Sequence, residues 1–252
     1  MADIRKNKAK EKLARGEVVT ALAGVDNADW VDFLGPTGID AIWIEAEHGR
    51  FDFSHLSDMT RACDLWGMTS IVRVGYTQPN LIYRTLDRGS QGIVVPHVNS
   101  RQEAELVVDS AKYAPIGHRG MYSTRQGHGV PDYLTRANDE TLIVILIEDI
   151  AAVRQLDEIL SVDHIDVFHV APSDLAQSMG HLGAEDHPEV LKTVDESIDR
   201  IVRSGRTAGT TATFDGVARY IEAGARFFYH DISDWIESGA SRYMAAVAAA
   251  QD

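Results

Sequence analysis

Residues 142–148 read Leu-Ile-Val-Ile-Leu-Ile-Glu, an unbroken apolar run that ends in an acidic side chain. A continuous, largely β-branched run of this length is typical of a strand buried on both faces, as in a parallel sheet. A second run, Ile165 to Val170, is followed closely by Asp174. Parallel α/β folds place their chemistry at the carboxyl ends of their strands. The two stretches therefore predict that Glu148 and Asp174 converge on one hard cation.

Short apolar runs alternate with longer amphipathic segments along the whole chain. The expected strands are 18–23, 41–46, 70–74, 92–96, 142–147, 165–170, 207–211 and 226–229, and the expected helices are 27–34, 54–66, 80–88, 100–111, 151–159, 188–204, 214–223 and 235–249. Several helices begin at an N-cap signal, such as Ser100 followed by Glu103. Eight strand–helix units without a linker predict a single (β/α)8 barrel domain over residues 1–252, with a doubly wound open sheet as the alternative. The one long irregular segment is 114–131, and a loop of this length in a compact domain is usually either functional or disordered.

Composition excludes several classes of protein. The net charge of −14 would repel a phosphate backbone, so no nucleic-acid partner is expected. The single cysteine, Cys63, lies inside an expected helix, which indicates a buried thiol and no disulfide. Residues 1–16 lack the apolar core of a signal peptide, and no apolar stretch reaches 18 residues. The chain is therefore expected to be cytoplasmic, without a membrane partner.

The second expected strand ends in Glu45-Ala46-Glu47-His48. A histidine beside carboxylates at a strand end has the chemistry of a general base, because its pKa lies near neutrality and a carboxylate can orient its ring. The alternative is a surface histidine with incidental acidic neighbours. The pattern favours the two interpretations about equally.

The third expected strand carries Arg73 within an apolar run. A buried guanidinium needs a partner, and at a catalytic mouth its planar fork suits a carboxylate or an enolate oxygen. The alternative is an ion pair with Glu45 or Glu47 that only closes the end of the barrel. Its position favours the functional interpretation.

Glu148 and Asp174 offer hard oxygen ligands, which favour Mg²⁺ or Mn²⁺, with Co²⁺ as a third candidate. Two protein carboxylates would leave coordination positions free for water and substrate, as a catalytic metal site requires. Asp174 also suits the start of a helix, and such a helix would present backbone amides to a substrate carboxylate. Asp149 follows Glu148 directly and is expected to point elsewhere.

The remaining histidines and motifs carry weaker signals. His97 and His128 could line the mouth, whereas the other candidates are expected to be ordinary, hydrogen-bonded polar residues: His164, His169, His181 and His187. No dinucleotide fingerprint, Walker loop, nucleophile elbow or H-E-x-x-H motif is present. No lysine falls in an expected strand, which argues against a Schiff-base aldolase and in favour of a metal.

The chain resembles the HpcH/HpaI family of metal-dependent class II pyruvate aldolases, relatives of the citrate lyase β-subunit in the phosphoenolpyruvate/pyruvate barrel superfamily. The stretches that carry the resemblance are 43–48, 72–73, 86–96, 113–120, 147–148, 171–175 and 179–180. They occur in the family's order and extend over most of the chain. Taken together, these stretches are specific for the family, although none would be specific alone.

The resemblance implies roles for individual residues. Glu148 and Asp174 would bind the divalent ion, and Arg73 would contact the oxygen that becomes an enolate. His48 would be the base, oriented by Glu45. Asp87 would reach towards the active site of a neighbouring subunit. The backbone amides at Ser173 and Asp174 would bind the carboxylate of the 2-oxo acid.

The implied protein is a (β/α)8 barrel whose last helix is exchanged within dimers, assembled as a hexamer that is a trimer of dimers. The implied reaction forms or cleaves a carbon–carbon bond between a 2-oxo acid and an aldehyde through a metal-bound enolate. Leu146 departs from the family, which commonly has glutamine there, so a reshaped donor pocket is expected that admits hydroxypyruvate as well as pyruvate. The loop 124–129 also departs from the family, which leaves the aldehyde open.

Two other functions stay open on the sequence. A CoA-thioester lyase of the citrate lyase β type would need a basic surface for the CoA phosphates, which the acidic composition opposes. An oligomeric barrel that only binds a 2-oxo acid is supported by Leu146 alone. Ion binding and turnover would separate these functions from an aldolase.

Overall fold

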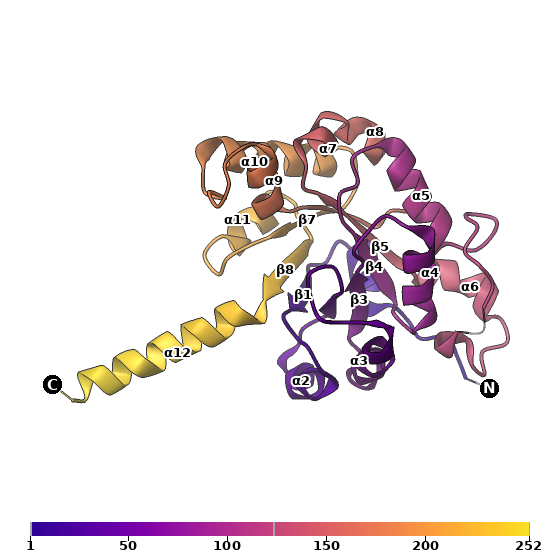
Figure 1. Ribbon diagram of the computed structural model, residues 1–252, viewed down its shortest axis with the longest axis horizontal. Helices are drawn as coiled ribbons and strands as arrows, with labels where there is room; N and C mark the ends of the chain where they lie inside the picture. The colour runs from indigo at the N-terminus through magenta and orange to yellow at the C-terminus, as the bar shows by residue number, and fades with distance from the viewer. Residues whose placement is uncertain (1, 123, 252) are drawn as a thin grey trace.

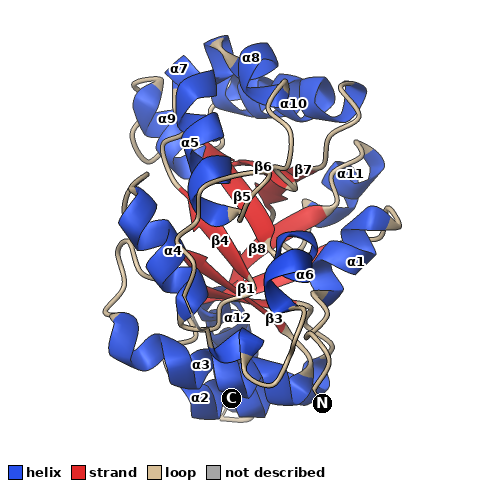
Figure 2. Cartoon of the chain, turned by 90° about the vertical axis from the view of Figure 1, so that its right-hand side faces the viewer, coloured by secondary structure: helices blue, strands red, loops and turns tan. Residues whose placement is uncertain are grey.

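Eight parallel strands close into a barrel in the computed structural model, which describes residues 2–122 and 124–251. Each strand pairs with the next along the chain, and β8 closes the circle by pairing with β1. The strands are β1 Val19–Ala23, β2 Ala41–Glu45, β3 Thr69–Arg73, β4 Gly92–Val95, β5 Leu142–Ile147, β6 Val167–Val170, β7 Ala208–Thr211 and β8 Phe227–Asp231. Helices surround these central strands in Figure 2. The predicted closed barrel is confirmed, and the open sheet is excluded.

The helices connect successive strands and close one end of the barrel. They are α1 Lys8–Ala14, α2 Ala28–Leu34, α3 Phe53–Trp66, α4 Pro79–Asp87, α5 Arg101–Ala111, α6 Tyr133–Glu140, α7 Ile150–Arg154, α8 Leu156–Leu160, α9 Pro172–Ser178, α10 Pro188–Arg203, α11 Val217–Glu222 and α12 Ile232–Ala249, with 3-10 turns η1 Gly35–Thr37 and η2 Arg125–Gly127. The expected helix 151–159 is in fact two, α7 and α8. At the start of α5, Ser100 caps the amide of Glu103, as predicted.

The pleat of β5 decides which side chains enter the barrel. Leu142, Val144 and Leu146 belong to the cluster that fills the barrel interior. The alternating isoleucines, 143, 145 and 147, belong to the cluster beneath the surrounding helices. Because successive strand side chains point to opposite faces, Glu148 continues the inward series. A six-residue apolar strand thus delivers one carboxylate to the barrel mouth.

The same alternation applies to the neighbouring strands. Trp43 lies in the interior cluster, so Glu45 two residues later also faces inward. Ile71 is interior on β3, which directs Arg73 to the mouth. Val167 is interior on β6, which turns His169 inward. Three strands therefore contribute a polar side chain to one enclosed region.

Helix α1 closes the opposite end of the barrel. Ala9 is fully buried in the interior cluster, and its amide donates to Thr69 Oγ1 at 3.1 Å. Asn7, also fully buried, caps the helix by accepting from the Lys10 amide. The same side chain donates to the backbone oxygen of Gln91 at 3.0 Å. This short helix was not among the expected elements.

Helix α12 leaves the barrel instead of covering it. In Figure 1 it extends from β8 away from the other helices to the C-terminus. Most of its side chains are exposed, including Ile236, Tyr243 and Met244. Near its start, an apolar groove of about 280 Å³ opens outside β1 and β8, with Leu22, Phe228 and Trp235 among its lining residues. The outer face of β1 and β8 is therefore left open by the chain's own last helix.

Two smaller expectations concern Cys63 and the long loop. The Cys63 side chain is buried and free, and burial raises the pKa of its thiol, as expected for an inert cysteine. Within the segment 114–131, the turn η2 contacts α3, because Arg125 Nη1 donates to Asp64 Oδ2 at 2.6 Å. Within the described part of the chain, no helix combines the length and apolarity needed to cross a bilayer.

Candidate active site

Arg73 stands between two carboxylates at the barrel mouth. Its Nε donates to Glu45 Oε2 at 2.6 Å and lies 3.2 Å from Glu47 Oε2. All three side chains are largely buried, and the indole nitrogen of Trp43 also approaches Glu45 Oε2 at 3.4 Å. The ion pairs expected as the alternative interpretation of Arg73 are therefore present. They do not exclude a catalytic role, because a guanidinium has five donors.

Glu148 is the most deeply buried carboxylate of the site, only 1% exposed. Its Oε1 accepts a hydrogen bond from the His97 amide at 2.7 Å. Its Oε2 is buried and has no hydrogen-bond partner among the described residues. Burial raises the pKa of Glu148 to about 7, and the charges of Asp174 and Glu47 act in the same direction. The described residues therefore leave this buried oxygen available to a ligand.

Asp174 enters from the next strand unit, in the first turn of α9. Its carboxylate is close enough to Glu148 for its charge to raise the pKa of that group. The neighbouring Asp149 points elsewhere, as expected, because its Oδ2 accepts from His97 Nδ1 at 3.0 Å and from Asn99 Nδ2 at 2.9 Å. Asp174 thus acts on Glu148 through its charge, while Asp149 holds the loop after β4.

A divalent cation fits this arrangement. An orphaned buried carboxylate oxygen beside a second carboxylate is an unfavourable state for a protein, because like charges and desolvation both oppose ionisation. A hard cation between Glu148 and Asp174 would remove both penalties. The donor set consists of oxygens, which suits Mg²⁺ or Mn²⁺.

His48 is exposed at the rim, beyond Glu47. Its Nε2 lies 3.8 Å from Glu47 Oε2, and its side chain is 71% exposed. Glu45 contacts the backbone and not the ring, since Glu45 Oε1 accepts from the amides of Glu47 and His48 at 2.8 and 3.1 Å. The β2 carboxylates therefore shape the turn that carries His48.

A cleft of about 510 Å³ adjoins the rim. Glu47, His48 and His97 line it, together with apolar side chains that include Phe51 and Tyr76. His97 has a left-handed backbone with φ of 52°, a rare conformation for a residue with a side chain. The expectation that His97 lines the mouth is confirmed.

Beneath the carboxylates, the barrel interior forms a mostly apolar floor. Leu146 is buried and lies directly opposite His169 on β6. The ring centroid of His169 is 5.8 Å from that of Trp43 and 6.3 Å from that of Tyr229. The expectation that His169 is an ordinary, hydrogen-bonded residue is wrong, because its buried Nδ1 has no partner among the described residues.

Two of the predicted site residues lie apart from this group. Asp87 ends α4, at the end of the barrel opposite the mouth, because barrel helices run antiparallel to the strands they follow. There it accepts from Arg119 Nη2 at 2.8 Å. Ser173 is exposed on α9, and its Oγ donates to Glu185 Oε1 at 2.6 Å. Neither side chain contacts the carboxylates of its own mouth.

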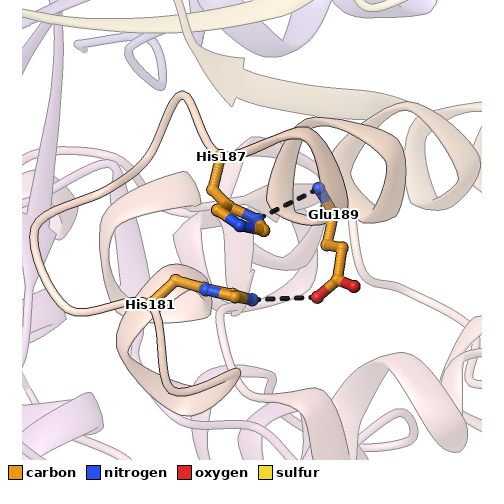
Figure 3. A group of neighbouring side chains, drawn as sticks. All are labelled: His181, His187 and Glu189. Atoms are coloured by element: carbon orange, nitrogen blue, oxygen red, sulfur yellow. Dashed lines mark hydrogen bonds and ion pairs between the residues drawn. The ribbon is translucent and has the colours of Figure 1, made fainter.

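A second group of potential metal ligands lies outside the barrel, in the segment between α9 and α10 and in the first turn of α10. The ligand atoms of His181, His187 and Glu189 lie within 4.8 Å of one another (Figure 3). His187 Nδ1 accepts from the Glu189 amide and so caps α10, while His181 Nε2 lies 3.0 Å from Glu189 Oε2. These bonds already engage the group, as expected for ordinary polar residues.

Glu47 is the site residue that sequence reasoning undervalued. It touches Arg73 and His48, and its charge raises the pKa of Glu148. Burial is the largest cause that raises its own pKa, against the lowering effect of Arg73. Glu45 is the last residue of β2 and Glu47 follows it by two residues, so nearness to the end of that strand is the sequence signal that points to Glu47.

Comparisons with known proteins agree with this geometry. A family model described as HpcH/HpaI aldolase/citrate lyase matches residues 22–237. A hydroxypyruvate/pyruvate aldolase of Roseovarius nubinhibens is 34% identical over 227 residues, covering 88% of each chain. A 5-keto-4-deoxy-D-glucarate aldolase of Escherichia coli K12 is 33% identical over 230 residues, covering 89% of this chain and 90% of that one.

Solved structures extend the agreement to the fold. An HpcH/HpaI aldolase/citrate lyase family protein from Burkholderia cenocepacia J2315 superposes with a TM-score of 0.89 at 25% identity, covering 96% of this chain and 99% of that chain. The match of a family model over most of the chain, together with relatives above 30% identity, identifies the family. The chain belongs to the HpcH/HpaI aldolase/citrate lyase family.

Proposed function

We propose that this chain is a divalent-metal-dependent class II aldolase, which forms or cleaves a carbon–carbon bond between a 2-oxo acid and an aldehyde. The observation that carries the proposal is the orphaned, buried Oε2 of Glu148, beside Asp174 and at the same mouth as Arg73. In a protein that binds no metal, burying Glu148 beside a second carboxylate would cost free energy without a compensating interaction. Membership of an aldolase and lyase family supports the same reaction class.

Glu148 and Asp174 would hold the ion, with Mg²⁺ or Mn²⁺ as the expected occupants. When bound, such an ion supplies Lewis-acid polarisation of the donor's keto group. The His97 amide, which donates to Glu148 Oε1, fixes the orientation of that carboxylate. The ion would thus neutralise the like charges of Glu148 and Asp174, in a mouth where the His97 amide already orients one of the two carboxylates.

Arg73 would stabilise the negative charge that develops on the keto oxygen of the donor. Two carboxylates, Glu45 and Glu47, hold its Nε edge and leave its other donors for the substrate. Preorganised donors aimed at a developing charge are a large source of catalysis. A lysine at this position could not reproduce the planar fork.

His48 would remove the proton from C3 of the donor and return one in the reverse direction. Its imidazole is exposed at the cleft, where solvent can exchange the proton. Glu47 is the carboxylate nearest to the ring, so Glu47 joins Glu45 as a candidate positioning residue for the base. The backbone amides at Ser173 and Asp174, in the first turn of α9, would bind the donor carboxylate.

The donor is proposed to be pyruvate or hydroxypyruvate. One of the similar proteins is named for both donors, and Leu146 contributes an apolar side chain to the floor below the proposed metal site. The alternative CoA-thioester lyase finds no support at the cleft, whose rim carries Glu47 and Asp52. A cytoplasmic location stays a prediction.

The assembly is proposed to be a homo-oligomer in which α12 is exchanged between subunits. The groove outside β1 and β8 is apolar, and α12 presents exposed apolar side chains at positions 236, 243 and 244. A partner's α12 in that groove would bury both surfaces. Asp87, which is remote from its own mouth, would then act at a neighbouring subunit's active site, in the hexamer implied by the family resemblance.

The proposal is tested by incubating the protein with pyruvate or hydroxypyruvate and with glyoxylate or glycolaldehyde. Mn²⁺ or Mg²⁺ should support aldol formation, and EDTA should abolish it. His48→Asn should slow C3 proton exchange in D₂O by about 100-fold, as expected when a general base is removed, while Mn²⁺ affinity stays within about 2-fold. Product formation that is insensitive to chelation, or its absence with every donor, would contradict the proposal.

A further inference from the structure

His169 lies on the inner wall of the barrel, one layer below the catalytic mouth. Its Cα is level with that of Leu146, two residues before Glu148 on the adjoining strand. Trp43, whose ring is 5.8 Å from that of His169, stands two residues before Glu45. Two residues of a strand span roughly 7 Å, so the imidazole lies just beneath the carboxylates.

The imidazole is buried and uncharged. The side chain is 2% exposed, and its Nδ1 has no hydrogen-bond partner among the described residues. Burial lowers the pKa of His169 to about 3, and the charge of Arg73 acts in the same direction. At neutral pH the ring therefore offers one donor and one acceptor, and no charge.

The rest of the floor has little hydrogen-bonding capacity to spare. Leu146 is apolar. The Trp43 indole nitrogen points at Glu45 Oε2, at 3.4 Å, and the Tyr229 hydroxyl points at Asp231 Oδ2, at 3.5 Å. His169 is thus the member of this floor with a free polar atom.

Gly209 on β7 borders that atom. A Cβ at this position would lie 3.0 Å from His169 Nδ1, closer than ordinary contact. Glycine here therefore avoids a steric clash with the imidazole. A buried polar atom without a partner is destabilising, and the penalty disappears when a ligand supplies the missing bond.

We propose that His169 determines donor specificity, and that its imidazole hydrogen-bonds the C3 hydroxyl group of a hydroxypyruvate-class donor. The inference rests on the proposed aldolase function. The donor's carboxylate and keto oxygens are assigned to the metal site, Arg73 and the α9 amides. The remaining polar group of hydroxypyruvate is a neutral hydroxyl, where pyruvate has only a methyl group. A neutral imidazole in an apolar floor can form a hydrogen bond with this hydroxyl group, but it cannot form one with the methyl group of pyruvate.

The test compares the two donors in wild type, His169→Phe and His169→Asn. With Mn²⁺ in D₂O, C3 proton exchange followed by NMR reports each donor without any aldehyde. We expect the ratio of kcat/KM for hydroxypyruvate to that for pyruvate to fall about 10-fold in His169→Phe, because one hydrogen bond to the hydroxyl is lost. His169→Asn, which keeps a polar atom near the position of Nδ1, should recover part of the ratio.

Thermal denaturation provides a readout that does not depend on turnover. His169→Phe should have a Tm no lower than that of wild type, since an unpartnered polar atom is replaced by an apolar ring. In wild type with Mn²⁺, hydroxypyruvate should raise Tm more than pyruvate does, and both variants should narrow that difference, His169→Phe the most.

The outcomes separate the inference from the proposed function. Exchange with both donors and an unchanged ratio in His169→Phe would overturn the inference alone. Should His169→Phe fail to fold, His169→Asn provides the test. The inference would then be overturned if the hydroxypyruvate-to-pyruvate ratio of kcat/KM in His169→Asn equals that of wild type and the two donors raise Tm by the same difference as in wild type. Wild-type protein that exchanges the protons of neither donor would overturn the proposed function, and the inference with it.

Discussion

At the residue scale, the proposed metal-dependent chemistry depends on a few charged side chains, which the pleat of the strands directs to the barrel mouth. Glu148 is the central one, because it is both the most buried acid and the one with an orphaned oxygen. Burial lowers the pKa of the Arg73 guanidinium, but the charges of Glu45, Glu47 and Glu148 together raise that pKa above its ordinary value. These groups explain why an ion should bind at this mouth.

Ion affinity should depend steeply on pH. Burial raises the pKa of Glu148 to about 7, and the ion requires the ionised carboxylate, so protons compete with the ion below that value. We expect Mn²⁺ affinity to fall about 10-fold per pH unit below pH 7, measured by calorimetry at pH 5.5, 6.5 and 7.5. Equal affinity at all three values would contradict the environment described for Glu148.

The raised pKa of Glu148 also makes the stability of the metal-free protein depend on pH. The folded-state pKa of Glu148 lies above the ordinary value of 4.5, so its contribution to stability is present below pH 4.5 and is lost as pH rises through 7. Glu148→Gln retains an acceptor for the His97 amide and has no charge to bury. Without metal, this variant should lose less stability than wild type between pH 4.5 and 7.5 in urea titrations.

Individual site residues differed in how far the sequence could predict them. Glu148 and Arg73 follow from alternation along short apolar strands, so the pattern alone places them at the mouth. Glu47 and His97 lie in loops just beyond strand ends, where period-two reasoning stops. The unpartnered Nδ1 of His169 could not be predicted, since it depends on which polar atoms the other strands of the barrel place around the ring.

At the element scale, the short helix α1 contributes more to the stability of the fold than its length suggests. The fully buried Asn7 side chain accepts from the Lys10 amide and Thr69 Oγ1, both at 3.1 Å, and donates to the backbone oxygens of Gln91 and Glu140, both at 3.0 Å. It thereby ties the helix to the bottom of the barrel.

Asn7→Ala should therefore destabilise the fold although it lies far from the site. We expect a loss of about 2–4 kcal/mol in the free energy of unfolding, because a cap is removed and buried partners lose their bonds. Chemical denaturation measures the loss, and Lys8→Ala on the same helix is the control, expected to stay within about 0.5 kcal/mol. Equal effects of the two substitutions would show that the buried network contributes little.

Elements with a strong apolar period were predicted well. The bounds of β5 were correct, and those of the other strands differ by at most two residues at an end. Helices α1 and α6 were missed because each buries a single alanine, which leaves no apolar stripe to recognise. The break between α7 and α8 falls at Gln155, where no glycine or proline signals it.

At the scale of the whole molecule, length and strand–helix alternation were sufficient to predict a closed barrel. They could not predict where α12 packs, because an amphipathic pattern identifies an apolar face and not its partner. The helix stands off its own barrel while the groove outside β1 and β8 stays open. Exchange between subunits would account for both features.

Disrupting α12 should change the oligomeric state. The double substitution Tyr243→Asp and Met244→Asp places charges on the exposed apolar part of the helix. We expect light scattering after size exclusion to give a smaller mass than for wild type, because charge opposes burial in a partner's groove. Leu65→Asp, an equally exposed apolar position on α3, is the control. An unchanged mass for the α12 variant would argue against the exchange.

The most direct test of the account is anomalous diffraction from crystals grown with Mn²⁺ and pyruvate. We expect one anomalous peak between the carboxylates of Glu148 and Asp174, at about 2.0–2.3 Å from an oxygen of each, and none in crystals of Glu148→Gln. Crystals that diffract well and lack that peak, or that bind Mn²⁺ only at His181 and His187, would contradict it.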